Sequence, residues 1–208
     1  MARLTLTTDA FVLLRRPSTT DAFQVLSVFS GAQGMLLVLQ RVSKSKRKGE
    51  VAMALDLFNE VSLVLESSNQ GQTWFVREAR VLRSAEGIGR DYEALQRASA
   101  FAWLVAQNTI PEETRARVYA LLGQAFGAFA ESPRPDVAYV KALYCLARDE
   151  GYPVKQEWVR SLAAADRAQV AELLNKPLAE QSANAEAVGR LRERLEAWVR
   201  TQTDIIVG

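Results

Sequence analysis

Residues 55–66 read LDLFNEVSLVLE, and apolar and polar side chains alternate along almost the whole stretch. A period of two is typical of a β-strand that buries one face and exposes the other. The stretch therefore predicts a strand whose apolar face is made by Leu55, Leu57, Val61, Leu63 and Leu65.

The sequence around this stretch has the composition of four more strands, at residues 9–16, 23–29, 35–42 and 73–82. Turn-forming residues separate them, among them SGAQG at 30–34 and SSNQGQ at 67–72. Five strands in so short a segment fit a small barrel, because closure removes the exposed edges of a sheet. We expect a five-stranded OB-fold at residues 1–82, with an SH3-like barrel as the alternative.

The pattern changes to a helical period after Ser84. Asp91 is a candidate cap for the first helix, whose expected apolar stripe is Tyr92, Leu95, Ala98, Ala102 and Val105. Further helices are expected at about 111–131, 135–151, 157–175 and 184–202. The chain is therefore expected to be α+β, with an all-helical domain at 88–208 and a boundary in SAEGIGR, residues 84–90.

The composition argues against catalysis and against a metal site. The chain has no histidine, which is the commonest general base and metal ligand, and one cysteine, Cys145. A single cysteine makes neither an internal disulfide nor a thiolate zinc site. We therefore expect a protein that is not an enzyme and has no cofactor. The N-terminal residues lack a signal-peptide pattern and no run is long enough to span a bilayer, so a soluble cytoplasmic protein without a membrane partner is expected.

The strongest functional signal is the basic run RVSKSKRK at residues 41–48, between the third and fourth predicted strands. It contains no acidic residue. Dense positive charge on a small β-domain is typical of a surface that binds polyphosphate, so we expect DNA binding there. The residues expected to contact phosphate are Arg41, Lys44, Lys46, Arg47 and Lys48.

Other side chains of the β-domain extend this hypothesis. Arg15 and Arg16, with Arg77 and Arg80, would lengthen the cationic path, although each is also typical of an ordinary solvated surface. Proteins that bind single strands add aromatic side chains on which bases stack. Two candidates are Phe58, which falls on the polar face of its predicted strand and is otherwise expected to pack on the helical domain, and Trp74. Trp74 and its neighbour Phe75 point to opposite faces, so one of them belongs to the core.

The order of several segments resembles the DNA repair protein RecO family. The similar segments cover most of the chain but are individually loose: TDAFVLLRR (8–16), TTDAFQVLSVFS (19–30), GMLLVLQRV (34–42), KSKRK (44–48), LDLFNEVSLVLE (55–66), YVKALYCLARDEGYPV (139–154) and LLNKPLAEQ (173–181). Many members carry a four-cysteine zinc module after the Gly-Tyr-Pro step. Here Gly151-Tyr152-Pro153 continues directly into VKQEWVRSL, so this chain lacks the module.

The resemblance implies an OB-fold followed by a helical domain, and a nucleoid-associated protein of DNA recombination and the DNA damage response. It implies binding of single- and double-stranded DNA, strand annealing, and action with RecR to load RecA onto gaps coated by single-strand binding protein. It also implies a groove in the helical domain for the acidic tail of that protein. The local candidates for the groove are Arg134, Val137, Lys141 and Tyr144, which equally fit a helix packed in the core. The alternative function is a protein–protein adaptor whose basic loop docks an acidic peptide, without a role on DNA.

Overall fold

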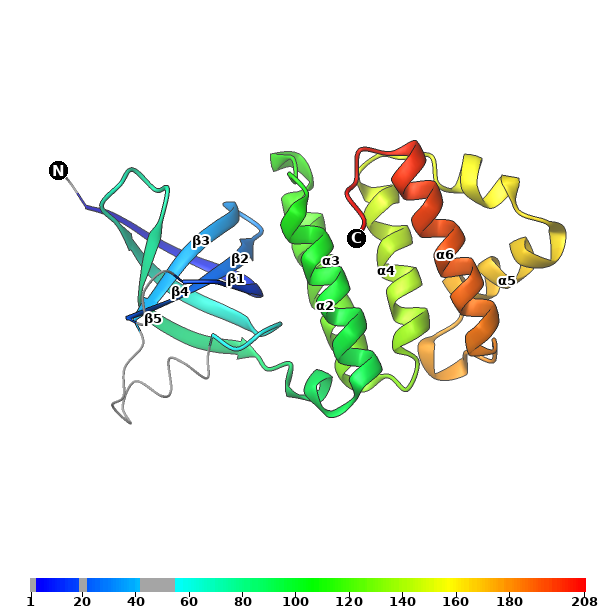
Figure 1. The fold of residues 1–208 in the computed structure, drawn as a ribbon, viewed down its shortest axis with the longest axis horizontal. Coiled ribbons are helices and arrows are strands. Elements are labelled where there is room, and N and C mark those ends of the chain that lie inside the picture. Colours follow the sequence, from blue (N-terminus) through cyan, green and yellow to red (C-terminus); the bar gives the residue numbers. More distant parts are fainter. Residues whose placement is uncertain (1–2, 19–21, 42–54) are drawn as a thin grey trace. The chain divides into compact units, whose positions relative to one another are not determined.

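The computed structural model describes residues 3–18, 22–41 and 55–208. Five strands come first and helices follow (Figure 1), so the expected α+β class is confirmed. The strands are β1 (Leu4–Arg16), β2 (Phe23–Ser30), β3 (Gly34–Arg41), β4 (Glu60–Ser67) and β5 (Trp74–Arg83).

The strands close into a barrel in the order β1-β2-β3-β5-β4. All pairings are antiparallel except β3 with β5, which is parallel and joins Val38 to Trp74 and Leu39 to Phe75. The alternation predicted for β4 is present, since Val61, Leu63 and Leu65 are completely buried in the barrel core. The turn between β2 and β3 ends at Gly34, whose φ of 74° is a left-handed conformation that suits glycine.

The strand predicted at residues 55–66 is wrong in its first part, because β4 begins only at Glu60. A turn precedes it. The N–H of Leu57 donates to the Asp56 carboxylate at 3.0 Å, and the N–H of Asn59 donates to the Asp56 carbonyl at 3.3 Å. Phe58 takes a positive φ of 68°, which interrupts an extended strand. A short polar side chain that bonds the backbone of the next residue favours a turn over the strand predicted from the alternation.

Helices form the rest of the chain. The longer ones are α2 (Tyr92–Gln107), α3 (Glu112–Glu131), α4 (Pro135–Asp149), α5 (Ala164–Asn175) and α6 (Ala185–Gln202), and the short ones are η2 (Glu86–Arg90), η3 (Lys155–Val159) and η4 (Leu178–Glu180). The predicted cap of α2 is confirmed, since the Asp91 carboxylate accepts a hydrogen bond of 2.7 Å from the N–H of Ala94. Asn184 caps α6 in the same way, at 2.8 Å from the N–H of Ala187.

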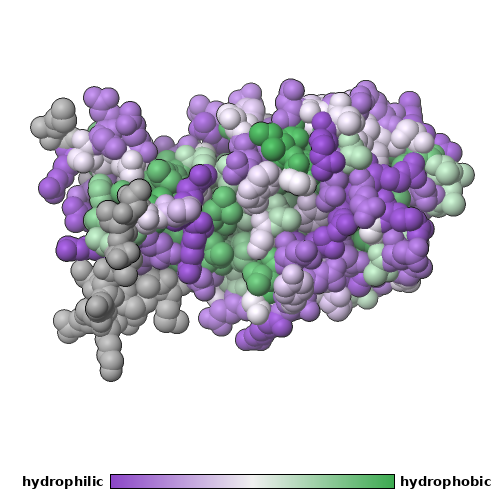
Figure 2. Space-filling view, in the orientation of Figure 1, coloured by the Kyte–Doolittle hydropathy of each residue, from purple (hydrophilic) through white to green (hydrophobic). Residues whose placement is uncertain are grey.

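Helix α4 is the centre of the helical core and packs against α2, α5 and α6. Figure 2 shows hydrophilic side chains over most of the visible surface of these helices. The predicted stripe of α2 is wrong at two positions, because Tyr92 is 81% exposed and Leu95 is also exposed. Phe101 and Leu104 are buried in their place, next to small alanines that allow close helix packing.

The chain divides into two compact units. One contains residues 1–85 and 109–122, and the other contains residues 86–108 and 123–208. The first unit, here called the barrel unit, thus includes the N-terminal half of α3. The Tyr119 ring lies 4.9 Å from the ring of Phe11, and its hydroxyl donates to Glu60 at 2.7 Å. These contacts cover the outer face of β1, which explains why Phe11 is buried although its neighbours Ala10 and Val12 fill the barrel core.

Within the described residues, no helix has the length and apolar character needed to cross a bilayer.

Candidate nucleic-acid interface

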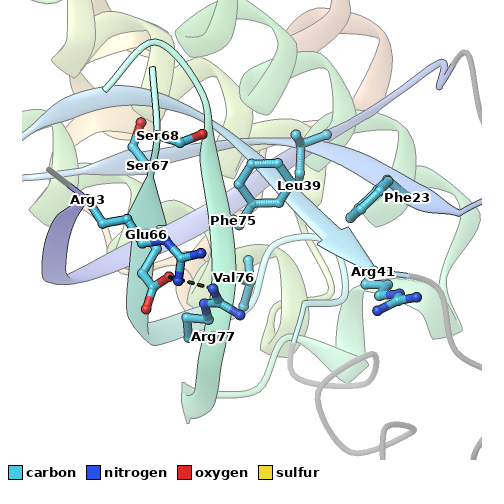
Figure 3. A pocket seen from close by; sticks show the side chains of 10 residues that line it. All are labelled: Arg3, Phe23, Leu39, Arg41, Glu66, Ser67, Ser68, Phe75, Val76 and Arg77. Atoms are coloured by element: carbon cyan, nitrogen blue, oxygen red, sulfur yellow. Dashed lines mark hydrogen bonds and ion pairs between the residues drawn. The ribbon is translucent and has the colours of Figure 1, made fainter. Parts of the chain in front are cut away.

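A hollow of about 300 Å³ opens on the barrel unit, where β3 and β5 run side by side (Figure 3). Its apolar lining comes from three strands and consists of Phe23, Leu39, Phe75 and Val76. Its polar lining consists of Arg3, Arg41, Glu66, Ser67, Ser68 and Arg77. The hollow therefore combines an apolar floor with a charged rim.

Two aromatic rings meet in this hollow. Phe23 begins β2, and Phe75 lies on β5, opposite Leu39 in the parallel pairing. The ring centroids of Phe23 and Phe75 are 5.7 Å apart with planes at 71°, which is an edge-to-face contact. Both side chains are half-buried, so each keeps part of its ring accessible. This geometry leaves an aromatic surface that a flat apolar group can contact.

Charges lie at both ends of the hollow. At one end, Glu66 forms ion pairs with Arg3, at 3.8 Å, and with Arg77. At the other end is Arg41, which pairs in register with Phe23. Figure 3 shows Phe75 and Leu39 between the Glu66 cluster and the end that holds Phe23 and Arg41. Among the described residues no acidic side chain forms an ion pair with Arg41, so its charge is available to an anion.

The loop that joins β4 to β5 borders the hollow and is held by side-chain hydrogen bonds. The Ser67 hydroxyl accepts from the N–H of Gly71 at 3.0 Å and contacts the amide oxygen of Asn69 at 2.8 Å. The Asn69 amide oxygen also accepts from the N–H of Thr73 at 3.1 Å. These bonds fix the loop, so one wall of the hollow is formed before any ligand binds.

The structure describes only part of the predicted phosphate path. Arg41 is exposed and lies at the hollow, whereas Lys44, Lys46, Arg47 and Lys48 are outside the described residues. Arg15 and Arg16 do not line the hollow. Arg15 pairs with Asp56 at 2.8 Å, and Arg16 donates to the Ser27 hydroxyl at 2.6 Å. Both side chains are exposed, but the charge of Arg15 is paired with a carboxylate, whereas Arg16 bonds a neutral hydroxyl.

The prediction that Phe58 and Trp74 stack on bases is wrong, because both side chains are buried. Phe58 is 4% exposed and Trp74 is 9% exposed, so neither ring has a free face for a base. Trp74 belongs to the barrel core, where it packs with Val38 and Leu65. Its neighbour Phe75 takes the outward position, and Phe23 joins it from β2. The alternation of β5 left this choice open, and nothing local in the sequence pairs Phe23 with Phe75.

A second hollow, of about 540 Å³, lies in the helical unit. Two of the four candidate groove residues, Lys141 and Tyr144, line it together with Arg148 and Lys155. Burial lowers the pKa of Lys141, and its ammonium donates to the carbonyl of Lys176 at 2.7 Å. Val137 is completely buried and does not reach this hollow.

Arg134 does not line the second hollow either. Its guanidinium donates to both carboxylate oxygens of Asp136, at 3.0 and 2.9 Å. The four predicted groove residues are therefore not brought together.

The remaining chemistry of the described residues is sparse. No group of three His, Cys, Asp or Glu side chains is placed to hold a metal ion within residues 3–18, 22–41 and 55–208. Cys145 is half-buried at the edge of the helical hollow, and burial raises the pKa of its thiol. A raised pKa leaves little thiolate at neutral pH, so this cysteine is not an activated nucleophile.

The chain matches no protein-family model and no curated protein.

Proposed function

We propose that the protein binds DNA as a recombination and repair mediator and that its barrel unit is an OB-fold. The observation that carries this proposal is the hollow between β3 and β5, with its aromatic pair and its arginine rim. Single-strand binders with OB-folds use this combination of aromatic platforms and cationic side chains. The basic run that follows Arg41 in the sequence supplies four more positive charges for phosphate.

The proposed activity is annealing of complementary strands, as the resemblance to the RecO family implies. Two polyanions repel each other, and a cationic surface lowers that repulsion without consuming a nucleotide. No nucleophile, metal or general base is needed for such a step, because base pairing itself supplies the free energy. The protein would bind single- and double-stranded DNA at the nucleoid and would act with RecR to load RecA.

The helical hollow supports a partner-binding role for the second unit. Lys141 and Lys155 bring two positive charges to a recess lined by Tyr144, and Arg148, which also lines it, pairs with Asp149 at 2.7 Å. An acidic peptide with apolar residues complements such a recess, and the tail of single-strand binding protein has this chemistry in the family resembled. The same observation favours the second candidate function, an adaptor for acidic peptides that has no role on DNA.

A charge-reversal variant tests the proposal. Lys44→Glu, Lys46→Glu and Arg47→Glu together change six units of charge (three lysine or arginine residues become glutamates), and should abolish DNA binding in fluorescence anisotropy and annealing in a fluorescence-quenching assay. Stability should change by less than about 1 kcal/mol, as for surface substitutions. The matched control reverses Arg160, Arg167 and Arg190, which are on the helical unit. Equal affinity of the loop variant and the wild type would refute the proposal, and peptide binding without DNA binding would favour the adaptor.

A further inference from the structure

The hollow between β3 and β5 has a shape and lining that suit one flat aromatic group. Its volume of about 300 Å³ is at the small end of ligand sites in proteins. Its floor is formed by Phe75, Leu39 and Phe23, which all contribute apolar surface. The surface around it is charged, so an entirely apolar ligand would not match the rim. A ligand that is flat and apolar at one end and anionic at the other matches both parts.

We infer that this hollow, here called the base seat, takes a single unpaired base of a DNA strand, with the adjoining phosphate at Arg41. The base would stack on the ring of Phe75 and meet Phe23 at its edge, because the planes of the two rings are inclined at 71°. This inference rests on the proposed function and names the part of the DNA that the hollow takes. Every base has a π-face, so stacking tolerates all four bases. The seat would therefore distinguish single strands from duplexes rather than one sequence from another.

The base seat should favour single strands because stacking requires a base with an uncovered face. In a duplex, both faces of each base are covered by its neighbours, so a base must leave the stack before it can contact a protein ring. The unstacking costs a few kcal/mol in intact duplex and least in strands that are already single. The seat therefore contributes to single-strand affinity and contributes little to duplex affinity, which phosphate contacts dominate.

The arrangement of charge defines which end of the hollow receives the phosphate. At the Glu66 end, one carboxylate pairs with two guanidiniums, those of Arg3 and Arg77, so the arginines there already have a carboxylate partner. Arg41 lies at the opposite end, beside Phe23, and within the described part of the chain no carboxylate neutralises it. The phosphate next to the seated base is therefore placed at Arg41.

The test compares an ordinary single-stranded oligonucleotide with one of equal length whose bases are removed at successive abasic sites. Phe75→Leu keeps an apolar side chain but removes the ring. It should weaken binding of the ordinary strand by about 5- to 150-fold, the range measured for one stacked base. It should leave binding of the abasic strand and of duplex DNA unchanged. The dependence on salt should also stay the same, because no charge is removed.

Three further variants separate stacking from folding. Phe75→Tyr keeps the ring and should retain single-strand affinity, and Phe23→Leu should reproduce the loss. Leu37→Ala is the matched control, because Leu37 is exposed on the same face of β3 as Leu39 but does not line the hollow. Circular dichroism should show a folded barrel for every variant.

The outcomes distinguish this inference from the function on which it rests. Wild-type protein that binds neither single nor double strands would overturn the proposed function itself. Two results would overturn the base seat and leave DNA binding through phosphates. One is equal affinity of the wild-type protein for the ordinary and the abasic strand. The other is single-strand affinity of the Phe75→Leu and Phe23→Leu variants equal to that of the wild type.

Discussion

Gly87 lies in η2, just after the last strand of the barrel, and its position leaves no room for a side chain. A Cβ atom added there would be 2.4 Å from the backbone carbonyl oxygen of Ala130. Real Cβ contacts essentially never fall below 3.0 Å, so η2 and α3 would have to separate locally by at least 0.6 Å, the difference between these distances. The carbonyl belongs to the backbone and a Cβ is fixed rigidly to its Cα, so neither can rotate away. Gly87→Ala should therefore destabilise the helical unit by about 3 kcal/mol, the upper part of the range for overpacking.

The matched control is Gly89→Ala, because a Cβ at Gly89 would meet no atom within 4 Å. This substitution should stabilise the unit by about 0.4–1 kcal/mol, since alanine restricts the unfolded chain more than glycine does. Thermal unfolding followed by circular dichroism measures both changes. The expected decrease for Gly87→Ala is about 10–20 °C for a unit of this size. Equal midpoints for the two alanine variants would refute the close packing of η2 on α3.

Two further predictions concern the hydrogen bond of Tyr119 within the barrel unit and the cap of α2 in the helical unit. Tyr119→Phe keeps the ring beside Phe11 but removes the hydroxyl that donates to Glu60, and should lower the free energy of unfolding of the barrel unit by about 1.5 kcal/mol in urea. This is the low end of the range of about 1.5–3 kcal/mol for bonds to charged groups, because Glu60 keeps its ion pair with Arg83 at 3.4 Å. An unchanged free energy would show that this hydroxyl does not hold α3 to the barrel. Burial, and then the bond to Glu60, raise the pKa of Tyr119, so the loss should be the same at pH 7 and pH 9. Asp91→Ala removes the cap of α2 and should lower the free energy of unfolding by about 1 kcal/mol, whereas Asp91→Asn should leave it nearly unchanged. Equal losses of stability in the two variants, measured by urea unfolding, would count against the cap.

Much of the fold follows from local patterns in the sequence. The alternation of Val61, Leu63 and Leu65 predicts their burial correctly, and the acidic residue before Tyr92 predicts the start of α2. The errors occur where a single residue outweighs the pattern. The Asp56 carboxylate accepts from the N–H of Leu57, and a turn forms in place of a strand. Tyr92 has helical spacing with the apolar stripe but lies in the first turn, where it is exposed.

The site is harder to predict, because its residues come together only through pairings that are distant in sequence. Phe23 and Phe75 are brought together by the parallel pairing of β3 with β5, for which the sequence has no local signal. Arg41 could be predicted because it begins a run of like charges. The ion pairs of Arg3 and Arg77 with Glu66 could not be predicted, because the spacing of these residues in the sequence does not reveal a shared partner.

The central claim is that the barrel unit binds DNA through phosphate contacts and through the base seat between β3 and β5. The most direct test is the affinity of the wild-type protein for a labelled single-stranded oligonucleotide across a salt series, measured by fluorescence anisotropy. If the five basic residues of the run at 41–48 all contact phosphate, the logarithm of affinity should fall with the logarithm of salt at a slope of about −3.5. Absence of binding even at low salt would contradict the account.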